Sequence, residues 1–217
     1  MKVTKFIVSA FLLISLAVPA FADVMPYYTS NITKDVIGFI QVPESFNVYA
    51  EPTQASELLE TLSWNKTEVK YSGGVMEPAI VFTLMFYDKK LAFCTVLDEY
   101  EGWYKIVYDK EKNLSGWIKP AIPQDFWNLR EFYTAYGKKY GLYYFKDAPE
   151  PTKKLHSGAS DTSQEIGGFD IVKFIKLSII RGNWALVSVV DMSDVPKTGF
   201  VKWRNADGQL YMFPKFE

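Results

Sequence analysis

The chain has 217 residues and carries 24 Lys and Arg against 25 Asp and Glu, a formal net charge of −1. This balance offers no basic surface for nucleic acid, and one His with one Cys excludes a Cys/His zinc site and an internal disulfide framework. The aromatic residues, 17% of the chain, favour β structure and contact surfaces instead. We expect neither a metal nor another cofactor.

The first 22 residues have the pattern of a secretory signal peptide. Lys2 and Lys5 precede an apolar run over 6–18, and small residues at Ala20 and Ala22 follow it as in a cleavage site. The run is shorter than the roughly 20 residues of a membrane-spanning helix, which disfavours an uncleaved anchor. We therefore expect cleavage after Ala22 and a periplasmic or secreted product without a membrane span.

Two copies of one unit follow the predicted signal peptide. Three blocks recur in the same order: 48–59 with 155–166, 102–107 with 182–187, and 115–119 with 198–202. In each copy an aromatic and β-branched run leads through a polar turn to a Gly-aromatic-aliphatic-Lys sequence. This pattern predicts a hairpin at the end of each unit.

The first copy carries additional residues around 64–90 that the second lacks. They include an apolar run over 79–87, followed by Asp88-Lys89-Lys90 and another apolar run, which predicts a hairpin. A long insertion in a compact domain is usually functional or a contact between subunits. A lid over the open end of a small barrel is an equal alternative.

A helix is predicted between the copies over 124–140. Asp125 can cap its start, Lys138 and Lys139 lie in its last turn, and Gly141 follows as a stop. Apolar residues recur at helical spacing: Phe126, Leu129, Phe132, Tyr133 and Tyr136. We expect this face to pack between the two copies, because exposing so many aromatic rings would be unfavourable.

The recurring blocks resemble the bacterial SH3-like (SH3b) family, which typically runs Asn-Val-Arg-x-Gly-Pro-Ser, a hydrophobic strand, Gly-Trp-Tyr-Lys-Val and Gly-Trp-Val. The first copy matches at Asn47-Val48, 102–106 and 116–118, and the second at 199–201. The second copy departs by having Leu155-His156 in place of Val-Arg and Asn183-Trp184 in place of Trp-Tyr. The resemblance covers roughly 35–119 and 141–213.

The resemblance implies a mainly β fold of two small SH3-like β-barrels in tandem, joined by one aromatic-rich helix. The expected parts are a signal peptide (1–22), a first SH3-like domain (23–123) with a hairpin insertion near 64–90, a connecting helix (124–140) and a second SH3-like domain (141–217).

The resemblance also suggests where a ligand would bind, because the loop after the first strand and the Gly-aromatic strands can border one groove. The expected ligand-binding residues are Tyr49, Glu51, Trp103, Tyr104 and Trp117 in the first copy and His156, Asp161, Trp184 and Phe200 in the second. The alternative is that the motif tryptophans belong to the core. Neighbours on a strand face opposite sides, so only one of Trp103 and Tyr104 can line a groove.

Catalysis is not expected. A papain-like peptidase needs a Cys and a His in a dedicated domain, whereas Cys94 lies in a β run that predicts a buried thiol and His156 lies in a polar loop. No serine-hydrolase elbow or phosphate loop occurs in the sequence. The acidic residues around 98–101 cluster in a turn, where a glycosidase pair is disfavoured.

The sequence therefore favours a non-catalytic exported binding module, with cell-wall peptidoglycan (its peptide or its glycan) as the expected partner. One alternative is a periplasmic interaction or scaffold protein that uses the insertion hairpin. The other is a cell-wall hydrolase, which the missing catalytic residues disfavour.

Overall fold

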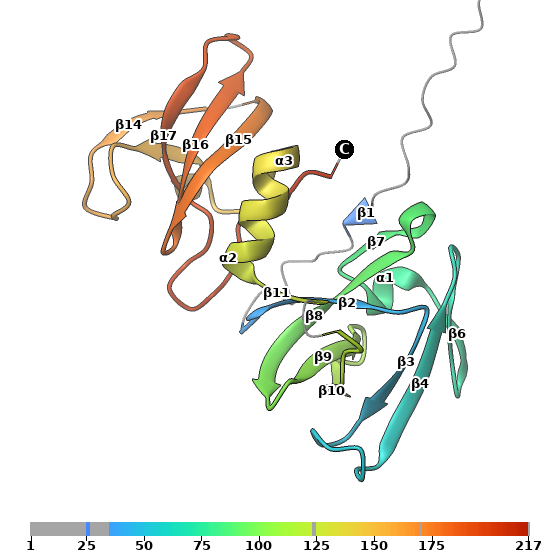
Figure 1. Cartoon of the computed structure of the whole chain (residues 1–217). Helices are drawn as coiled ribbons and strands as arrows, with labels where there is room; N and C mark the ends of the chain where they lie inside the picture. Colours follow the sequence, from blue (N-terminus) through green and yellow to red (C-terminus); the bar gives the residue numbers. More distant parts are fainter. Residues whose placement is uncertain (1–24, 27–34, 123–124, 170, 217) are drawn as a thin grey trace, which may run out of the picture.

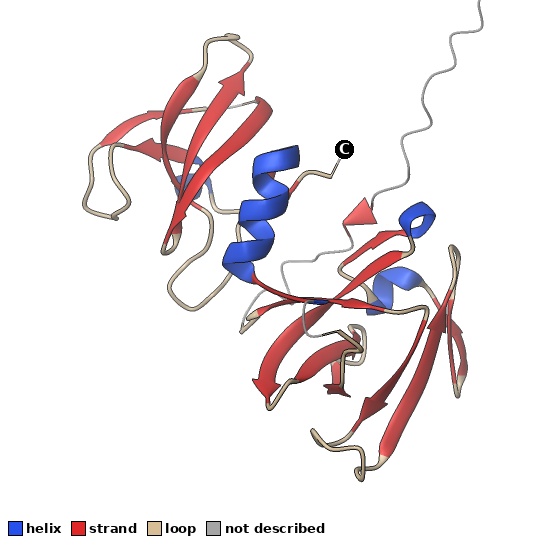
Figure 2. Ribbon diagram, in the orientation of Figure 1, coloured by secondary structure: helices blue, strands red, loops and turns tan. Residues whose placement is uncertain are grey.

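Two antiparallel sheets joined by one helical segment make up the described part of the chain, residues 25–26, 35–122, 125–169 and 171–216 of a computed structural model (Figures 1 and 2). The predicted signal peptide, 1–22, lies outside these residues, as does Gln124, the predicted first residue of the helix. Among the described residues, no helix has the length and apolar character needed to cross a membrane.

The first sheet and its insertion contain β1 (Met25–Pro26), β2 (Gly38–Val42), β3 (Ser45–Tyr49), β4 (Leu58–Trp64), β5 (Val69–Tyr71), β6 (Gly74–Met76), α1 (Pro78–Val81), β7 (Leu84–Phe86), η2 (Tyr87–Lys89), β8 (Leu91–Tyr100), β9 (Trp103–Asp109), β10 (Leu114–Ile118) and β11 (Phe126–Asn128). The helical segment comprises α2 (Leu129–Phe132), η4 (Tyr133–Gly137) and α3 (Lys138–Tyr140). The second sheet and its short helix contain β12 (Leu142–Tyr144), η5 (Glu150–Lys153), β13 (Lys154–His156), β14 (Glu165–Gly168), β15 (Val172–Arg181), β16 (Trp184–Asp191), β17 (Lys197–Lys202) and β18 (Met212–Pro214).

Seven strands of each sheet pair in the same order, which confirms the internal repeat. In the first sheet the order is β11-β2-β8-β9-β10-β3-β4, and in the second it is β18-β12-β15-β16-β17-β13-β14. Even the irregularity recurs, since the register shifts between Val48 and Tyr49 in β3 and between Leu155 and His156 in β13. The fold is mainly β, as predicted. Within the described residues the edge strands of neither sheet pair with each other, so the closed SH3-like barrel stays a prediction.

The strand pairing corrects the alignment of the second block by one residue. Tyr100 pairs with Trp103 across one two-residue turn, and Arg181 pairs with Trp184 across the other. The first position of such a hairpin turn needs a positive φ, and it is held by Glu101 (φ 49°) in one copy and by a glycine, Gly182 (φ 58°), in the other. Aligning glycine on glycine is therefore wrong, and Trp103 corresponds to Trp184.

The insertion extends the first sheet at two places. Its β5 pairs with β4, and its β7 pairs with β8 through the predicted hairpin at 88–90. The apolar run over 79–87 is not one strand, however, because its first half forms α1. The amine of Lys110 donates to the backbone O of Ala79 (2.9 Å) and of Phe82 at the end of this helix, and burial lowers the Lys110 pKa to about 8. The fully buried Val81 and Phe82 make the insertion part of the first sheet's core.

The helical segment begins later than predicted. Asn128 caps it by accepting the N–H of Glu131 (2.9 Å), and the preceding residues form β11, which pairs with β2. Gly38 in β2 permits this approach, because an added Cβ would lie 2.3 Å from the backbone O of Trp127. The predicted cap at Asp125 is therefore wrong, whereas the predicted stop at Gly141 is confirmed.

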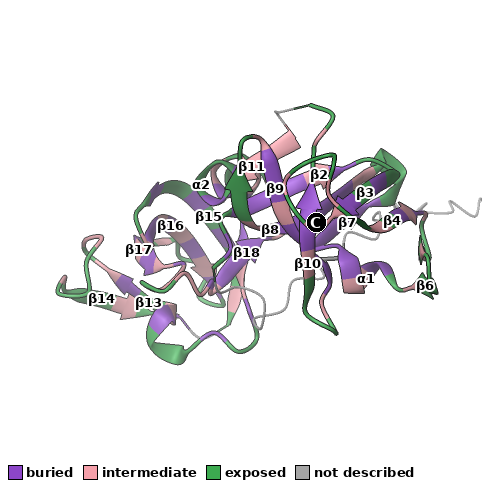
Figure 3. Ribbon diagram, turned by 90° about the horizontal axis from the view of Figure 1, so that it is seen from below, coloured by how far each residue is buried: buried purple, intermediate pink, exposed green. Residues whose placement is uncertain are grey.

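One core runs from the first sheet through the helical segment into the second sheet (Figure 3). The fully buried Phe132 is its centre, with ring centroids 4.5 Å from Phe39 and 5.8 Å from Phe93 on one side and 5.8 Å from Phe213 on the other. Tyr133 adds a hydrogen bond from its hydroxyl to the backbone O of Met212 (2.6 Å). The predicted packing of this face between the two copies is confirmed.

Candidate ligand-binding site

A tyrosine, a tryptophan and a lysine form a cluster on the outer face of the first sheet. Tyr49 ends β3, Trp103 begins β9 and Lys119 directly follows β10. The Tyr49 ring stands edge-on to the Trp103 ring, with centroids 5.6 Å apart, and the Lys119 amine lies 5.6 Å from the Trp103 centroid. These contacts leave Trp103 only 7% exposed, yet they come from side chains on the surface rather than from the core.

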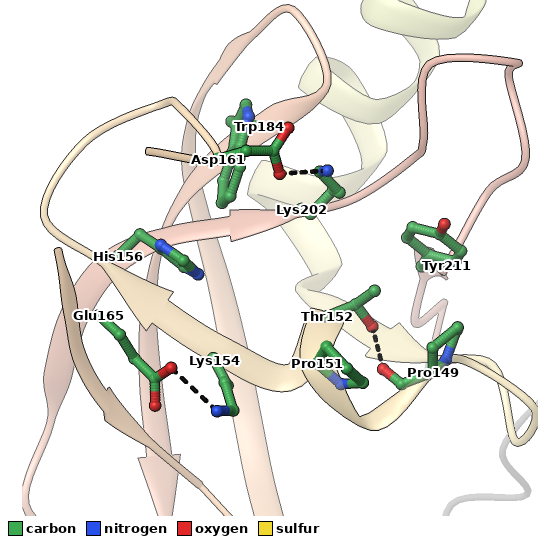
Figure 4. Close-up of a pocket in the computed structure, with 10 residues that line it drawn as sticks. All are labelled: Pro149, Pro151, Thr152, Lys154, His156, Asp161, Glu165, Trp184, Lys202 and Tyr211. Atoms are coloured by element: carbon green, nitrogen blue, oxygen red, sulfur yellow. Dashed lines mark hydrogen bonds and ion pairs between the residues drawn. The ribbon is translucent and has the colours of Figure 1, made fainter. Parts of the chain in front are cut away.

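The second copy repeats this cluster at the matching strand positions. His156 stands edge-on to Trp184, with ring centroids 4.9 Å apart, and the Lys202 amine lies 5.4 Å from the Trp184 centroid (Figure 4). The lysine is placed by register, because Lys202 pairs directly with Trp184 across β17 and β16. Both copies therefore place a half-buried ring and a cation against a tryptophan face, where the ring's quadrupole attracts a cation.

Each cluster borders a surface hollow. The first, of about 490 Å3, is lined by Gln41, Pro43, Ser45, Phe46, Asn47, Tyr49, Gln54, Trp103, Ile118, Lys119, Pro120 and Ala121. The second, of about 410 Å3, is lined by Pro149, Pro151, Thr152, Lys154, His156, Asp161, Glu165, Trp184, Lys202 and Tyr211. Both hollows lie over three matching strands of the repeated frame, β3, β9 and β10 in the first sheet and β13, β16 and β17 in the second, so they are equivalent positions.

The loop between β3 and β4 and its counterpart between β13 and β14 have the same backbone hydrogen bonds. Residues 50–57 are closed by the N–H of Ala50 bonding to the O of Glu57 (3.0 Å), and 157–164 by the N–H of Ser157 bonding to the O of Gln164 (2.9 Å). A second backbone hydrogen bond joins residues three apart in each loop. The N–H of Ser56 donates to the O of Thr53 and the N–H of Ser163 to the O of Ser160, both at 3.1 Å. At the matching position these loops bring Gln54 to the first hollow and Asp161 to the second.

The charges of the two hollows differ. In the second, Lys202 forms an ion pair with Asp161, and Lys154 forms another with Glu165 (2.9 Å; Figure 4). In the first, the Lys119 amine donates to the backbone O of Glu101 (3.0 Å), and no described carboxylate lies within ion-pair distance of it. The first hollow is therefore cationic, whereas the four charged side chains of the second neutralise each other.

Five of the nine predicted binding residues line the hollows: Tyr49, Trp103, His156, Asp161 and Trp184. Tyr104 does not, because it faces the core, where its ring stacks on Phe126 with centroids 4.6 Å apart and burial raises its pKa. The alternation argument therefore assigns Trp103, and not Tyr104, to the groove.

The other three predicted binding residues lie near the hollows but do not line them. Trp117 pairs with Tyr49, and Phe200 pairs with His156, one strand away from each loop. The Arg181 guanidinium lies 5.7 Å from the Phe200 ring centroid. Glu51 is exposed in the first loop, where its backbone N–H donates to the Ser56 hydroxyl (2.9 Å).

The two lysines are the functional candidates that sequence reasoning missed. Lys119 and Lys202 each end the Gly-aromatic-aliphatic-Lys block, so the signal was present in both copies. It was overlooked because the resemblance directs attention to the aromatic residues of that block. Gln54 was missed for a different reason, since an exposed amide in a turn has no distinctive sequence context.

The residues required for thiol chemistry are separated. Cys94 is fully buried in β8 of the first sheet, and this burial raises its pKa to about 12, so it stays a neutral thiol as predicted for a small hydrophobe. His156 belongs to the second hollow, where its Nδ1 donates to the backbone O of Ser163 (3.2 Å). Among the described residues, no group of three His, Cys, Asp or Glu could hold a metal ion.

No protein-family model matches the chain, and no curated protein is similar to it.

Proposed function

We propose that this protein is an exported, non-catalytic binding module of two SH3-like units that holds cell-wall peptidoglycan in its two hollows. The observation that carries the proposal is the repetition of the cluster Tyr49–Trp103–Lys119 as His156–Trp184–Lys202. Packing of a hydrophobic core does not require a lysine against a tryptophan face at the same register position in both copies. A binding surface uses this arrangement, because the rings offer rigid contact area and the lysine offers a hydrogen-bond donor.

Two features of the chain point to a cell-wall polymer as the partner. The predicted signal peptide directs the protein out of the cytoplasm. The repeated strand order, with its loop after β3 or β13 and its Gly-aromatic strands, supports the resemblance to the SH3b family.

The insertion gives less support to the alternative of a scaffold protein. Its Val81, Phe82 and Leu84 side chains are fully buried in the chain's own core and cannot meet a partner. Catalysis also remains disfavoured, because Cys94 and His156 lie in different sheets.

Retention on purified peptidoglycan tests the proposal. The mature protein, residues 23–217, is expected to sediment with peptidoglycan, and the double variant Tyr49→Ala/His156→Ala is expected to lose about tenfold or more of the affinity, since both hollows lose a ring. Tyr87→Ala removes an exposed tyrosine that lines neither hollow and should sediment like the wild type. Failure of the wild type to sediment, or equal retention of the double variant, would contradict the proposal.

A further inference from the structure

We propose that the first hollow binds a carboxylate of its ligand on Lys119, and that the second hollow fills the same place with its own Asp161. This inference rests on the proposed function and names the chemical group that the first hollow recognises. It follows from comparing two sites that share a frame but differ in one loop residue.

Asp161 shows what the tryptophan–lysine pair can hold. Its carboxylate comes from the loop over 157–164 and meets the Lys202 amine beside Trp184 (Figure 4). The Asp161 side chain is 73% exposed, whereas the Lys202 side chain is only 24% exposed. The lysine is thus the fixed member of the pair, and a carboxylate reaches it from the solvent side. Such a charge-assisted hydrogen bond is stronger than one between neutral groups.

The first hollow has the same lysine without that carboxylate. Lys119 lies at nearly the same distance from Trp103 (5.6 Å) as Lys202 from Trp184 (5.4 Å). The matching loop position is Gln54, whose neutral amide supplies no charge, and none of the residues that line the first hollow is acidic. The Lys119 amine uses one of its three donors on the backbone O of Glu101, which leaves donors for an anion.

The rest of the first hollow fits a ligand that joins a carboxylate to an uncharged amide or sugar. Ser45, Asn47 and Gln54, which carry a hydroxyl and two amides, line this hollow together with Tyr49. Peptidoglycan stem peptides carry free carboxylates next to amides and an N-acetyl sugar, whereas the bare glycan of N-acetylglucosamine is neutral. The cationic hollow therefore favours the acidic muropeptide over the neutral glycan.

Calorimetric titration with muramyl dipeptide, which carries one free carboxylate, tests this inference. The wild type is expected to bind one equivalent. Gln54→Asp should weaken this site about tenfold, because the new carboxylate competes for Lys119 as Asp161 does for Lys202. The reciprocal variant Asp161→Asn should gain a second, comparable site.

Three controls separate charge from shape. Gln54→Asn has the size of the aspartate variant without its charge and should lose much less affinity than Gln54→Asp. Ala55→Asp places the same charge on the neighbouring exposed residue, which lines neither hollow, and should bind like the wild type. Muramyl dipeptide with its carboxylate amidated should bind about tenfold more weakly to the wild type.

The outcomes distinguish this inference from the proposed function. Equal binding of the amidated compound or of an N-acetylglucosamine tetramer, or an unchanged affinity in Gln54→Asp, would overturn the carboxylate site. So would retention on peptidoglycan with no binding of muramyl dipeptide, and in each of these cases the proposed function stands. If the wild type neither sediments with peptidoglycan nor binds muramyl dipeptide, both the proposed function and the carboxylate site are contradicted.

Discussion

Replacing Phe132 with Ala is expected to lower the free energy of unfolding by about 3–5 kcal/mol, the range for truncating a fully buried aromatic ring. Its ring contacts the rings of Phe39 and Phe93 in the first sheet and of Phe213 in the second. The cavity would lie where both sheets meet the helix, and a rigid β frame on either side can collapse only partly into it. Denaturant unfolding followed by circular dichroism measures the loss.

The matched control is Phe174→Ala, which truncates the same residue type at a position of β15 where it is 39% exposed. We expect this variant to lose about 1 kcal/mol or less. A loss in Phe132→Ala no larger than in Phe174→Ala would contradict the placement of Phe132 at the centre of a shared core. The same experiment shows whether the sheets unfold together, since a severed core would produce two separate transitions.

Gly116→Ala is expected to destabilise the protein by about 1–3 kcal/mol, the usual cost of overpacking. The added Cβ would lie 2.5 Å from a methyl carbon of Val48 and 3.0 Å from the backbone O of Tyr49. Val48 is fully buried, so the strain falls on the pairing of β10 with β3. The glycine of the matching block is also close to its neighbouring strand, since a Cβ on Gly199 would lie 3.1 Å from the backbone O of His156 in β13, but this contact is looser than the one at Gly116.

Gly168→Ala serves as the control for this substitution. A Cβ on Gly168 would meet no atom within 4 Å, so the change is expected to be neutral or to stabilise by up to about 1 kcal/mol through the unfolded state. Thermal melts of the two variants measured side by side give the difference. Equal melting temperatures would show that β10 and β3 do not approach as closely as described.

Local patterns in the sequence were enough to find the repeat, because strands and turns leave their periodicity in neighbouring residues. Local patterns could not predict the residue-by-residue alignment of the second block. Trp103 and Trp184 follow turns whose glycines occupy different positions, and only the strand pairing fixes the correspondence.

Long-range pairing explains the other errors. Phe126 fits a helical spacing with Leu129 and Phe132, yet the strand over 126–128 pairs with β2, which lies more than eighty residues earlier in the chain. The apolar run over 79–87 likewise divides into α1 and β7, and Lys110, from the distant β9–β10 turn, binds the backbone O of Ala79 within α1 and of Phe82 just after it. The local sequence does not predict the pairing with β2 or the contact with Lys110.

Some of the candidate binding residues were predictable from the local sequence, and others depend on long-range contacts. Trp103 and Trp184 could be proposed from their blocks, and the alternation of strands correctly left only one of Trp103 and Tyr104 for the groove. The contribution of Lys119 and the contrast between Gln54 and Asp161 needed the loops and strands to be brought together. A charge difference between two equivalent sites becomes evident only when both sites are assembled.

The central claim is that two equivalent hollows exist and that only the first is open to a carboxylate. Nuclear magnetic resonance of the tryptophan indole N–H groups during titration with muramyl dipeptide tests it most directly, because each hollow contains one tryptophan. We expect the Trp103 signal to shift progressively, the Trp184 signal to stay in place, and the Trp184 signal to respond once Asp161 is replaced by Asn. A shift of the Trp184 signal in the wild type, or no shift of the Trp103 signal, would contradict the account.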